Sequence, residues 1–428
     1  MASSRSAAWL SAHRKVLVLL ALTAVAYFGA INRNQAFLWV VPALLSATLI
    51  AGFVWPRWLV RRLKVSRSGP SRAEEGETIE FSVVVENGGW LPRFMVEVVD
   101  RLPFVGLSDA GSPAVDKLLG VLAYLPGRKR SHFVVPVLCE KRGYYRLGPV
   151  GLASSFPLGL AEAGCSHNEG IQTLTIYPDV FPILSLPLRG APSQIHRGGY
   201  LLPEGAGAAE FSGLREYRRG DNPRHVHWPT TARLNELMVR EYEPLASACL
   251  YVVLDQAAES NVGLGKESTF EYAVRIAASM ARSACTQSIR TRIAGDGQRP
   301  LRGLAGAGSG HFQGILDELA VVACDGDVPY AQTLTQIGPQ CLRGETVVVF
   351  LSERSARWPA TLQALATPLA RQAHLFAVVF DQAGFVPAGT SRTGTGADPA
   401  ATTAALLELG AHCLTVRRGD DLVRLFNP

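Results

Sequence analysis

Acidic and hydroxyl side chains follow two strongly apolar segments of the chain and could supply metal ligands. Asp255 and Glu259 come after one apolar run, and Ser352 and Glu353 come directly after another. If both runs are parallel strands, their carboxyl ends meet at one edge of a sheet, where open α/β sheets bind ligands. Carboxylate and hydroxyl oxygens are the hard ligands that Mg²⁺ prefers. The pattern therefore indicates an acidic pocket that can be tested for magnesium.

A second candidate is the segment 210–243, in which arginines and carboxylates alternate among aromatic residues. Guanidinium groups favour bidentate pairs with carboxylates and stack on aromatic rings. In a structural interpretation, the arginines pair with nearby carboxylates and clamp a connector onto the following domain (Arg215, Arg224 and Arg233 with Glu210, Glu216 and Asp221). In a functional interpretation, part of the set faces a protein partner, as Arg and aromatic anchors often do. The candidate interface residues are Glu210, Phe211, Arg215, Tyr217, Arg218, Arg219, Gly220, Asp221, Arg224, Trp228 and Arg233.

Other chemistries find little support in the sequence. His225 and His227 lack a third zinc ligand nearby, and no G-x-S-x-G elbow is present. The glycines of residues 197–207 are not followed by the Lys-Ser/Thr of a phosphate-binding loop. We therefore predict neither an enzymatic activity nor a resident cofactor, with magnesium as the alternative.

The seven cysteines are scattered, odd in number and free of any C-x-x-C pair. Several lie in apolar runs, such as Cys249. Such residues are usually buried, reduced thiols of a protein that stays in a reducing compartment.

The residues after 244 alternate between apolar strands and helices. We expect strands at 249–254, 346–351, 375–380 and 413–416, and helices at 269–287, 312–322, 358–370, 400–409 and 420–426. Continuous apolar strands that alternate with helices predict a doubly wound parallel sheet, covered on both faces.

Residues 68–180 follow a different sequence pattern, in which Gly and Pro recur at regular intervals and helical periodicity is scarce. We expect strands at 78–85, 94–99, 132–138 and 173–177. Alternating polar and apolar residues between turns predict an antiparallel β-sandwich, similar to immunoglobulin or fibronectin domains.

Two uncharged apolar runs, 16–31 and 36–55, open the chain. A membrane-crossing helix needs about 20 such residues, so the second run is long enough and the first is marginal. We expect a transmembrane hairpin, with Pro42 bending the second helix; a signal peptide and a buried soluble hairpin are the alternatives. Basic residues precede and follow the hairpin, which places both ends in the cytoplasm.

The net charge of +6 is concentrated beside these runs, because residues 1–73 contain no acidic residue, and this disfavours nucleic-acid binding.

The spacing E-F-x-x-x-R-x-Y-x-x-G-D-x-x-R-x-(V/I)-x-W-x-x-x-A-R, filled from Glu210 to Arg233, resembles the bacterial domain-of-unknown-function 58 family. The segments 142–149 and 156–160 resemble a second landmark of that family. The resemblance implies a membrane-anchored protein with a von Willebrand A-like domain, associated with MoxR-type AAA+ ATPases. Domains of that type hold a metal with D-x-S-x-S. Here Asp255 matches, but Ala257 and Glu259 replace the serines, which favours a metal-free remnant.

Together these observations predict five segments. They are a transmembrane hairpin (1–67), a β-sandwich (68–180), a Gly/Pro-rich connector (181–209), the family segment (210–243) and a von Willebrand A-like α/β domain (244–428). We expect a scaffold on the bacterial inner membrane, with its soluble domains in the cytoplasm, that works with a MoxR-type ATPase on a protein client. The alternative is a metal-dependent binding or catalytic domain.

Overall fold

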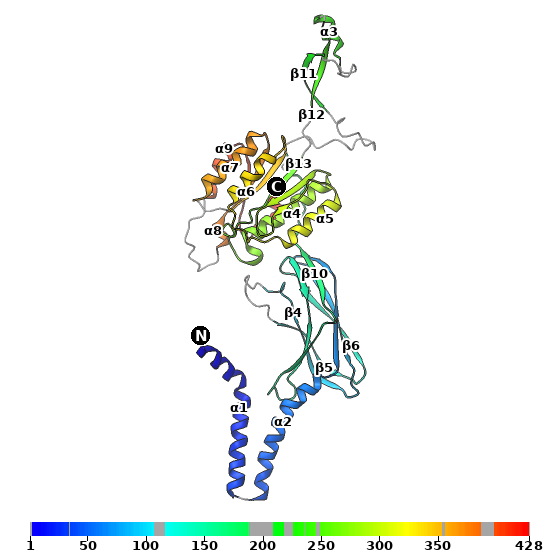
Figure 1. The fold of residues 1–428 in the computed structure, drawn as a ribbon, viewed down its shortest axis with the longest axis vertical. Helices are drawn as coiled ribbons and strands as arrows, with labels where there is room; N and C mark the ends of the chain where they lie inside the picture. Colours follow the sequence, from blue (N-terminus) through cyan, green and yellow to red (C-terminus); the bar gives the residue numbers. More distant parts are fainter. Residues whose placement is uncertain are drawn as a thin grey trace. The chain divides into compact units, whose positions relative to one another are not determined.

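The computed structural model describes residues 2–33, 35–106, 116–186, 188, 209–217, 226–234, 236–244, 249–352, 356–386 and 398–427. The chain divides into two compact units, Met1–Ile176 and Tyr177–Pro428. Figure 1 traces the chain from the N-terminus, in blue, to the C-terminus, in red.

Two apolar helices begin the first unit. α1 (Ala2–Arg33) and α2 (Val40–Val60) are joined by the short helix η1 (Ala36–Trp39) and contact each other, with the Tyr27 hydroxyl 3.1 Å from the Ser46 hydroxyl. Segments Arg14–Arg33 and Ala36–Val60 are long and apolar enough to cross a membrane. The first run, marginal in the sequence, thus becomes a sufficient 20-residue segment once the helix is extended at its ends.

The sequence predicts that Pro42 bends the second helix, but the position of Pro42 in α2 gives no reason for a bend. α2 begins at Val40, so Pro42 lies in the first helical turn, where its missing N–H breaks no helical hydrogen bond. The proline inside α2 is Pro56.

The rest of the first unit is built from three sheets around one hydrophobic core. Their orders are β1–β3–β6, β2–β10–β7 and β5–β4–β8–β9. The strands are β1 (Leu63–Ser68), β2 (Arg72–Glu74), β3 (Thr78–Asn87), β4 (Arg93–Arg101), β5 (Asp116–Leu125), β6 (Arg130–Leu138), β7 (Gly143–Leu147), β8 (Val150–Ser154), β9 (Ala163–His167) and β10 (Gln172–Tyr177). Alternate residues of β3, including Phe81 and Val83, enter the core, as expected for a strand with one buried face.

One ion pair is enclosed in this unit. The guanidinium of Arg67 bonds the carboxylate of Asp100, and neither side chain is exposed to solvent. Arg67 also donates to the carbonyl of Gly170 at 3.0 Å and lies 5.1 Å from the ring centroid of Phe81. A buried charge needs such partners, because an isolated one is costly to remove from water.

The second unit contains a six-stranded sheet in the order β15–β14–β13–β16–β17–β18. Its strands are β13 (Cys249–Val253), β14 (Arg290–Gly295), β15 (Leu301–Arg302), β16 (Thr346–Leu351), β17 (His374–Phe380) and β18 (His412–Val416). Strands β14, β13, β16, β17 and β18 run parallel, as predicted, but the two-residue edge strand β15 is antiparallel. The sheet is therefore mixed, not wholly parallel.

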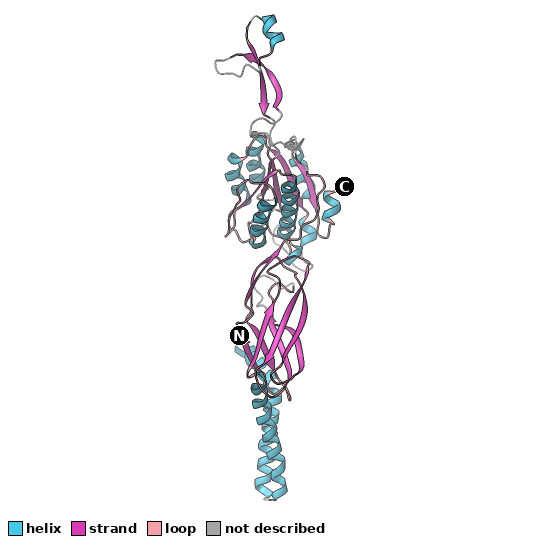
Figure 2. Ribbon diagram, turned by 90° about the vertical axis from the view of Figure 1, so that its right-hand side faces the viewer, coloured by secondary structure: helices cyan, strands magenta, loops and turns pink. Residues whose placement is uncertain are grey.

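Helices cover both faces of this sheet (Figure 2). One core joins Leu250, Val252 and Val348 to helices α4 (Thr269–Thr286), α5 (Ser309–Val321) and α10 (Leu422–Phe426). The opposite core joins Tyr251 and Val253 to helices α6 (Tyr330–Ile337), α7 (Trp358–Ala370) and α9 (Pro399–Glu408). The second unit also contains the short helices η3 (Gly265–Glu267), η4 (Gly338–Gln340) and α8 (Gln382–Phe385). Successive strand residues point to opposite faces, so a run without polar residues is buried on both sides.

A separate hairpin contains the family segment. β11 (Ala209–Glu216) pairs antiparallel with β12 (Met238–Pro244), with an irregularity between Phe211 and Gly213, and α3 (Trp228–Leu234) lies between the two strands in sequence.

Candidate functional site

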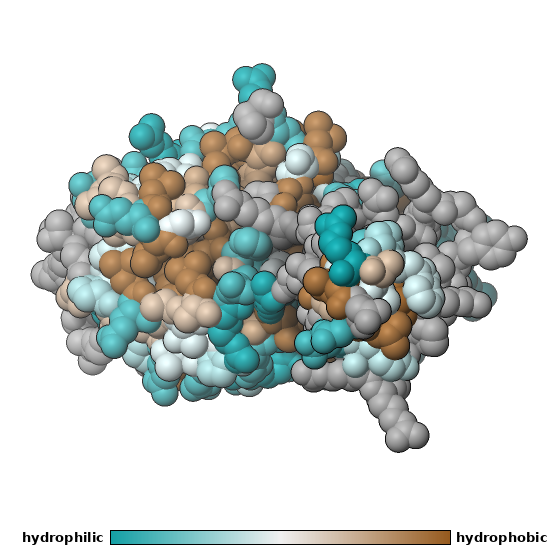
Figure 3. Space-filling view, turned by 90° about the horizontal axis from the view of Figure 1, so that it is seen from above, coloured by the Kyte–Doolittle hydropathy of each residue, from teal (hydrophilic) through white to brown (hydrophobic). Residues whose placement is uncertain are grey.

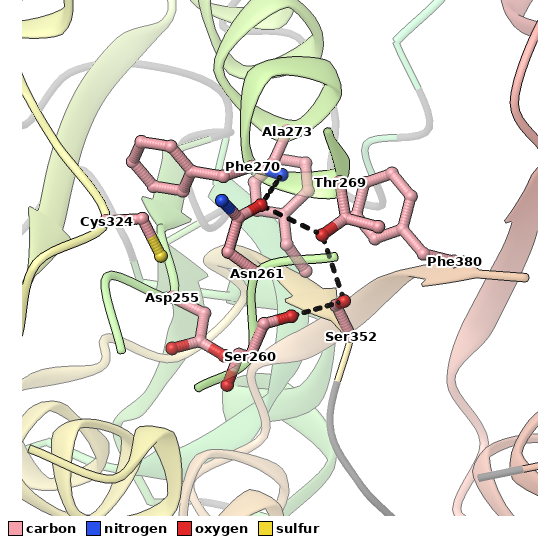
Figure 4. Close-up of a pocket in the computed structure, with 10 residues that line it drawn as sticks. Asp255, Ser260, Asn261, Thr269, Phe270, Ala273, Cys324, Ser352 and Phe380 are labelled. Carbon is pink, nitrogen blue, oxygen red and sulfur yellow. Dashed lines mark hydrogen bonds between the residues drawn. The ribbon is translucent and has the colours of Figure 1, made fainter. Parts of the chain in front are cut away.

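The candidate site lies where the strand order of the α/β sheet reverses. The chain passes from β13 to β14 on one side and later returns to β16 on the other, so β13 and β16 flank the switch point where open α/β sheets bind ligands. Asp255 follows β13 and Ser352 directly follows β16, and both line one small pocket. Figure 4 shows this pocket, whose other lining residues include Ser260, Asn261, Thr269, Phe270 and Cys324.

Hydroxyl groups tie the two strand ends together. The Ser352 hydroxyl donates to the carbonyl of Ser260 at 2.7 Å and lies 3.1 Å from the hydroxyl of Thr269. Thr269 is the first residue of α4, and its oxygen accepts from the backbone N–H of Val262 at 3.0 Å. Both hydroxyls are buried, so these bonds fix the loop between β13 and α4 against the end of β16.

The carboxylate of Asp255 shapes the first part of that loop. Its Oδ1 accepts from the backbone N–H of Ala257 at 3.0 Å, the pattern of an Asx turn. Ala257 bridges to Gly326 in parallel fashion, and the Gln256 amide donates to the carbonyl of Arg299 at 3.3 Å. The loop is therefore held by contacts on both sides.

The predicted metal ligands are only partly brought together. Asp255 and Ser352 share the pocket, whereas Glu259 forms an ion pair with Arg357 at 2.8 Å, and Glu353 lies outside the described residues. Among the described residues, no group of three or more His, Cys, Asp or Glu side chains could hold a metal ion. The metal-free remnant stays a prediction, with magnesium binding as its alternative.

Sequence reasoning missed three polar residues of this network. Ser260, Thr269 and Gln382 were not candidates, although the Gln382 amide donates to the backbone carbonyl of Ser352 at 2.6 Å. One signal was available, because Ser260 stands one place beyond the second serine position of the D-x-S-x-S pattern. Thr269 and Gln382 carried none, since each is far from the motif in sequence.

The residues of the family segment are distributed over the hairpin. Glu210, Phe211 and Arg215 belong to β11, and Trp228 and Arg233 belong to α3. Arg218, Arg219, Gly220, Asp221 and Arg224 lie outside the described residues. The predicted clamp of arginines and carboxylates is therefore not tested.

Backbone bonds order the described part of this hairpin. The N–H of Tyr217 donates to the carbonyl of Leu237 at 2.8 Å, and that of His227 donates to Met238 at 2.8 Å. Trp228 has 66% of its surface exposed, and Leu234 and Leu237 are exposed as well. Figure 3 shows apolar and polar residues intermixed on the face of the molecule seen from above.

All seven cysteines are free thiols. Burial raises the pKa of Cys139 to about 11, with a smaller contribution from the charge of Glu77. Burial also raises the pKa of Cys341 to about 11, assisted by the charge of Glu345. Raised pKa values keep these thiols protonated and unreactive at neutral pH.

Comparisons with known proteins define the class of this two-unit protein with apolar N-terminal helices. Residues 213–380 match the family model described as "Protein of unknown function DUF58". The "Uncharacterized protein YeaD" of Bacillus subtilis (strain 168) is 24% identical over 348 residues, which cover 80% of this chain and 83% of that protein. Both matches lie with the DUF58 family, and the family predicted from the Glu210–Arg233 spacing is confirmed by the model match over residues 213–380.

Solved structures give weaker likenesses. The CARDB domain of the PF1109 protein from Pyrococcus furiosus is 15% identical, covering 27% of this chain and 91% of that chain, with a TM-score of 0.18. A β-glucosidase from Listeria innocua in complex with gluconolactone is 13% identical, covering 26% of this chain and 16% of that one, with a TM-score of 0.17. A superoxide reductase (Neelaredoxin) variant from Ignicoccus hospitalis is 12% identical, covering 26% of this chain and 79% of that one, with a TM-score of 0.16. Similarity at this level carries no argument about fold or activity.

Proposed function

We propose that this protein is a non-enzymatic scaffold anchored in the bacterial inner membrane. In this proposal, α1 and α2 span the bilayer, the first unit carries an immunoglobulin- or fibronectin-like β-sandwich, and the second carries a von Willebrand A-like domain. The observation that carries it is the pair of apolar helices, whose spans of 20 and 25 residues have mostly exposed side chains and lead directly into folded units. Exposed apolar helices of this length need a lipid environment.

The character of the switch-point pocket supports a structural role for its polar groups. The hydroxyls of Ser352 and Thr269 are engaged with each other and with the main chain. A nucleophile needs an adjacent base instead. The second candidate function is a metal-dependent domain, and the observation that favours it is that Asp255 and Ser352 line one pocket.

Charge around the helices supports a cytoplasmic location for the folded units. Arg14 and Lys15 are the first two residues of the first span, and Arg61, Arg62 and Lys64 follow the second. The positive-inside rule then places both ends of the chain in the cytoplasm. A C-terminal green fluorescent protein fusion should be fluorescent, and a C-terminal alkaline phosphatase fusion should be inactive. The reverse pair of results would contradict this orientation.

The family hairpin is the proposed binding surface for a MoxR-type AAA+ ATPase and its client. Trp228 is exposed, and the segment supplies several arginines near it in sequence. Aromatic and arginine side chains are the commonest energetic anchors of protein interfaces. The ATPase itself is proposed from the family resemblance.

The experiment is affinity purification of the full chain from mild detergent, with and without ATP. Charge reversal in the variant Arg218→Glu/Arg219→Glu should leave the thermal unfolding midpoint unchanged and abolish capture of the ATPase. The matched control is Arg282→Glu, an exposed arginine on α4, which should retain capture. If the hairpin variant fails to fold, the arginines are structural. If it folds and still captures the ATPase, the proposed surface is wrong.

A further inference from the structure

One end of the first unit adjoins the point where the chain leaves α2. Strand register places Leu63 opposite Asn87, Arg93 opposite Leu125, and Ser154 opposite Ala163. The turns 88–92 and 126–129 and the loop 155–162 therefore lie at this same end. We call these three segments, together with residues 61–64, the proximal rim.

Hydrogen bonds join the segments of the rim to one another, and Arg93, the first residue of β4, links them to the end of α2. The N–H of Gly88 donates to the carbonyl of Arg62 at 2.9 Å, and the N–H of Arg128 donates to the carbonyl of Gly89 at 2.8 Å. The guanidinium of Arg93 lies 4.0 Å from the ring centroid of Trp58 and donates to the carbonyl of Arg61 at 3.1 Å. The end of the helix and the turns of the sheets thus form one continuous surface.

The loop 155–162 also extends back along the helix. Leu160 packs on Gly52, where an added Cβ would lie 2.6 Å from Leu160 Cδ1. Gly52 precedes the end of α2 at Val60 by about 12 Å along the helix axis. Trp55 and Trp58, with ring centroids 5.9 Å apart, lie between these two points, where a membrane interface is expected. The loop therefore reaches the depth of the proposed interface.

Large apolar side chains of the rim and of the adjoining ends of β4 and β5 are exposed. The exposed fractions are 73% for Trp90, 57% for Tyr124 and 43% for Leu158. Phe94 lies between Tyr124 and Phe156, with ring centroids 5.4 and 6.4 Å away. Aromatic rings with an apolar body are the side chains that membrane interfaces favour.

Positive charge surrounds these apolar groups. The exposed cations of the rim and of the first residue of β6 are Arg61, Arg62, Lys64, Arg128, Lys129 and Arg130. Two carboxylates lie near this end: Glu86 pairs with Arg130 at 3.1 Å, and Glu162 is exposed at the end of the loop 155–162. The opposite end of the unit has several carboxylates, including Glu74, Glu77 and Glu140. The charge of the unit is therefore polarised towards α2.

We propose that the proximal rim is a lipid-binding surface that inserts Leu158 and neighbouring aromatic rings into the bilayer interface and binds anionic phospholipid headgroups. Apolar side chains of interfacial elements enter by about 5–10 Å, and nearby basic residues are attracted to an anionic surface. This inference rests on the proposed membrane anchoring, because α2 brings the rim to the bilayer. It adds a second, peripheral contact to the two spanning helices.

The first test is photocrosslinking of the full chain in phosphatidylcholine vesicles that contain phosphatidylglycerol. A benzoylphenylalanine placed at Leu158 should yield a phospholipid adduct by mass spectrometry. The control position is Leu138, which is also 43% exposed but lies at the far end of β6, about 26 Å from the rim. Adducts at both positions, or at neither, would overturn the proposal, as would a protein adduct at position 158 in cells.

The second test addresses headgroup charge. Phosphatidylglycerol should be enriched over phosphatidylcholine among the adducts at position 158, and Lys129→Glu should reduce this enrichment roughly fivefold. Lys141→Glu, an exposed lysine at the opposite end, should leave it unchanged. Equal behaviour of the two variants would refute the headgroup contact. Carbonate extraction separates this outcome from failure of the anchor, since an unanchored chain would leave the membrane fraction altogether.

Discussion

The hydroxyl of Ser352 donates a 2.7 Å hydrogen bond to the carbonyl of Ser260, 92 residues earlier in the chain. This bond crosses the switch point of the α/β sheet and joins the end of β16 to the loop after β13. Because both residues are buried, the bond replaces hydration that the loop carbonyl would otherwise need.

Ser352→Ala should therefore lower the free energy of unfolding of the second unit by about 1–3 kcal/mol, because it leaves the Ser260 carbonyl without this donor. Thr335→Ala is the matched control, since its hydroxyl bonds the Ala331 carbonyl at 2.8 Å on an exposed helix surface. The control should shift stability by less than about 0.5 kcal/mol. Denaturant unfolding of the full chain in detergent measures both, and equal losses would show that the Ser352 bond has no special role.

Magnesium titration of the second unit, within the full chain, should give no saturable heat. The reason is that Ala257 occupies one serine position of the metal pattern, while Glu259 is held by Arg357 and the Ser352 hydroxyl by Ser260. Isothermal titration calorimetry is the measurement. Micromolar binding that disappears in Asp255→Ala would reverse this prediction and favour the metal-dependent function.

Asp100→Asn should destabilise the first unit by about 3–5 kcal/mol, because the buried charge of Arg67 then lacks its counterion. The double variant Arg67→Met/Asp100→Leu should recover most of that loss. Thermal unfolding of the two proteins gives the comparison. Glu86→Gln, which removes the exposed partner of Arg130, serves as the control and should cost less than about 1 kcal/mol. If the double variant were as unstable as Asp100→Asn, the loss of stability could not be attributed to the unpaired charge of Arg67.

Alkaline pH should destabilise the second unit through Cys341. Burial, then the charge of Glu345, raises the pKa of this thiol from 9.0 to about 11 in the folded state. Between these values the unfolded chain has already lost the proton, so stability falls as pH rises, by up to about 1.4 kcal/mol per pH unit. Below pH 9 the effect is absent.

The check is the unfolding free energy as a function of pH for the wild type and Cys341→Ala. The variant should show a shallower decline in the second unit between pH 9.0 and about 11, while the first unit keeps the decline due to Cys139. Identical profiles for both proteins would exclude Cys341 as the cause.

Many strands and helices of the α/β unit could be predicted from uninterrupted runs of apolar residues and from helical periodicity. The expected strand 346–351 and helix 358–370 coincide with β16 and α7, because runs without polar residues and helices with a Pro near the first turn have clear ends. β14 was not predicted, since Arg290 and Arg292 interrupt its apolar residues. Arg292 is accommodated by Glu345 and by the ring of Tyr251, contacts that only the fold reveals.

The site was predictable only in part for a similar reason. Asp255 and Ser352 follow strands that are visible in the sequence, so the topology brings them together. Thr269, the first residue of α4, and Gln382, the first residue of α8, contact Ser352 only because the fold brings these helices to the end of β16. Neither residue belongs to a sequence motif that would have marked it as part of the site. The β11–β12 pairing was also missed, because dense charge in the family segment hides its alternation.

Only Arg61 and Arg62 separate α2 from β1, the helix contacts strands β4, β8 and β9, and its residues Gly52, Pro56 and Leu59 are buried. The short connection and these contacts couple the orientation of the helix to that of the sheets. If α2 spans the bilayer as proposed, a change in bilayer thickness that tilts this helix would turn the sheets with it, so the orientation of the first unit would follow the thickness of the membrane.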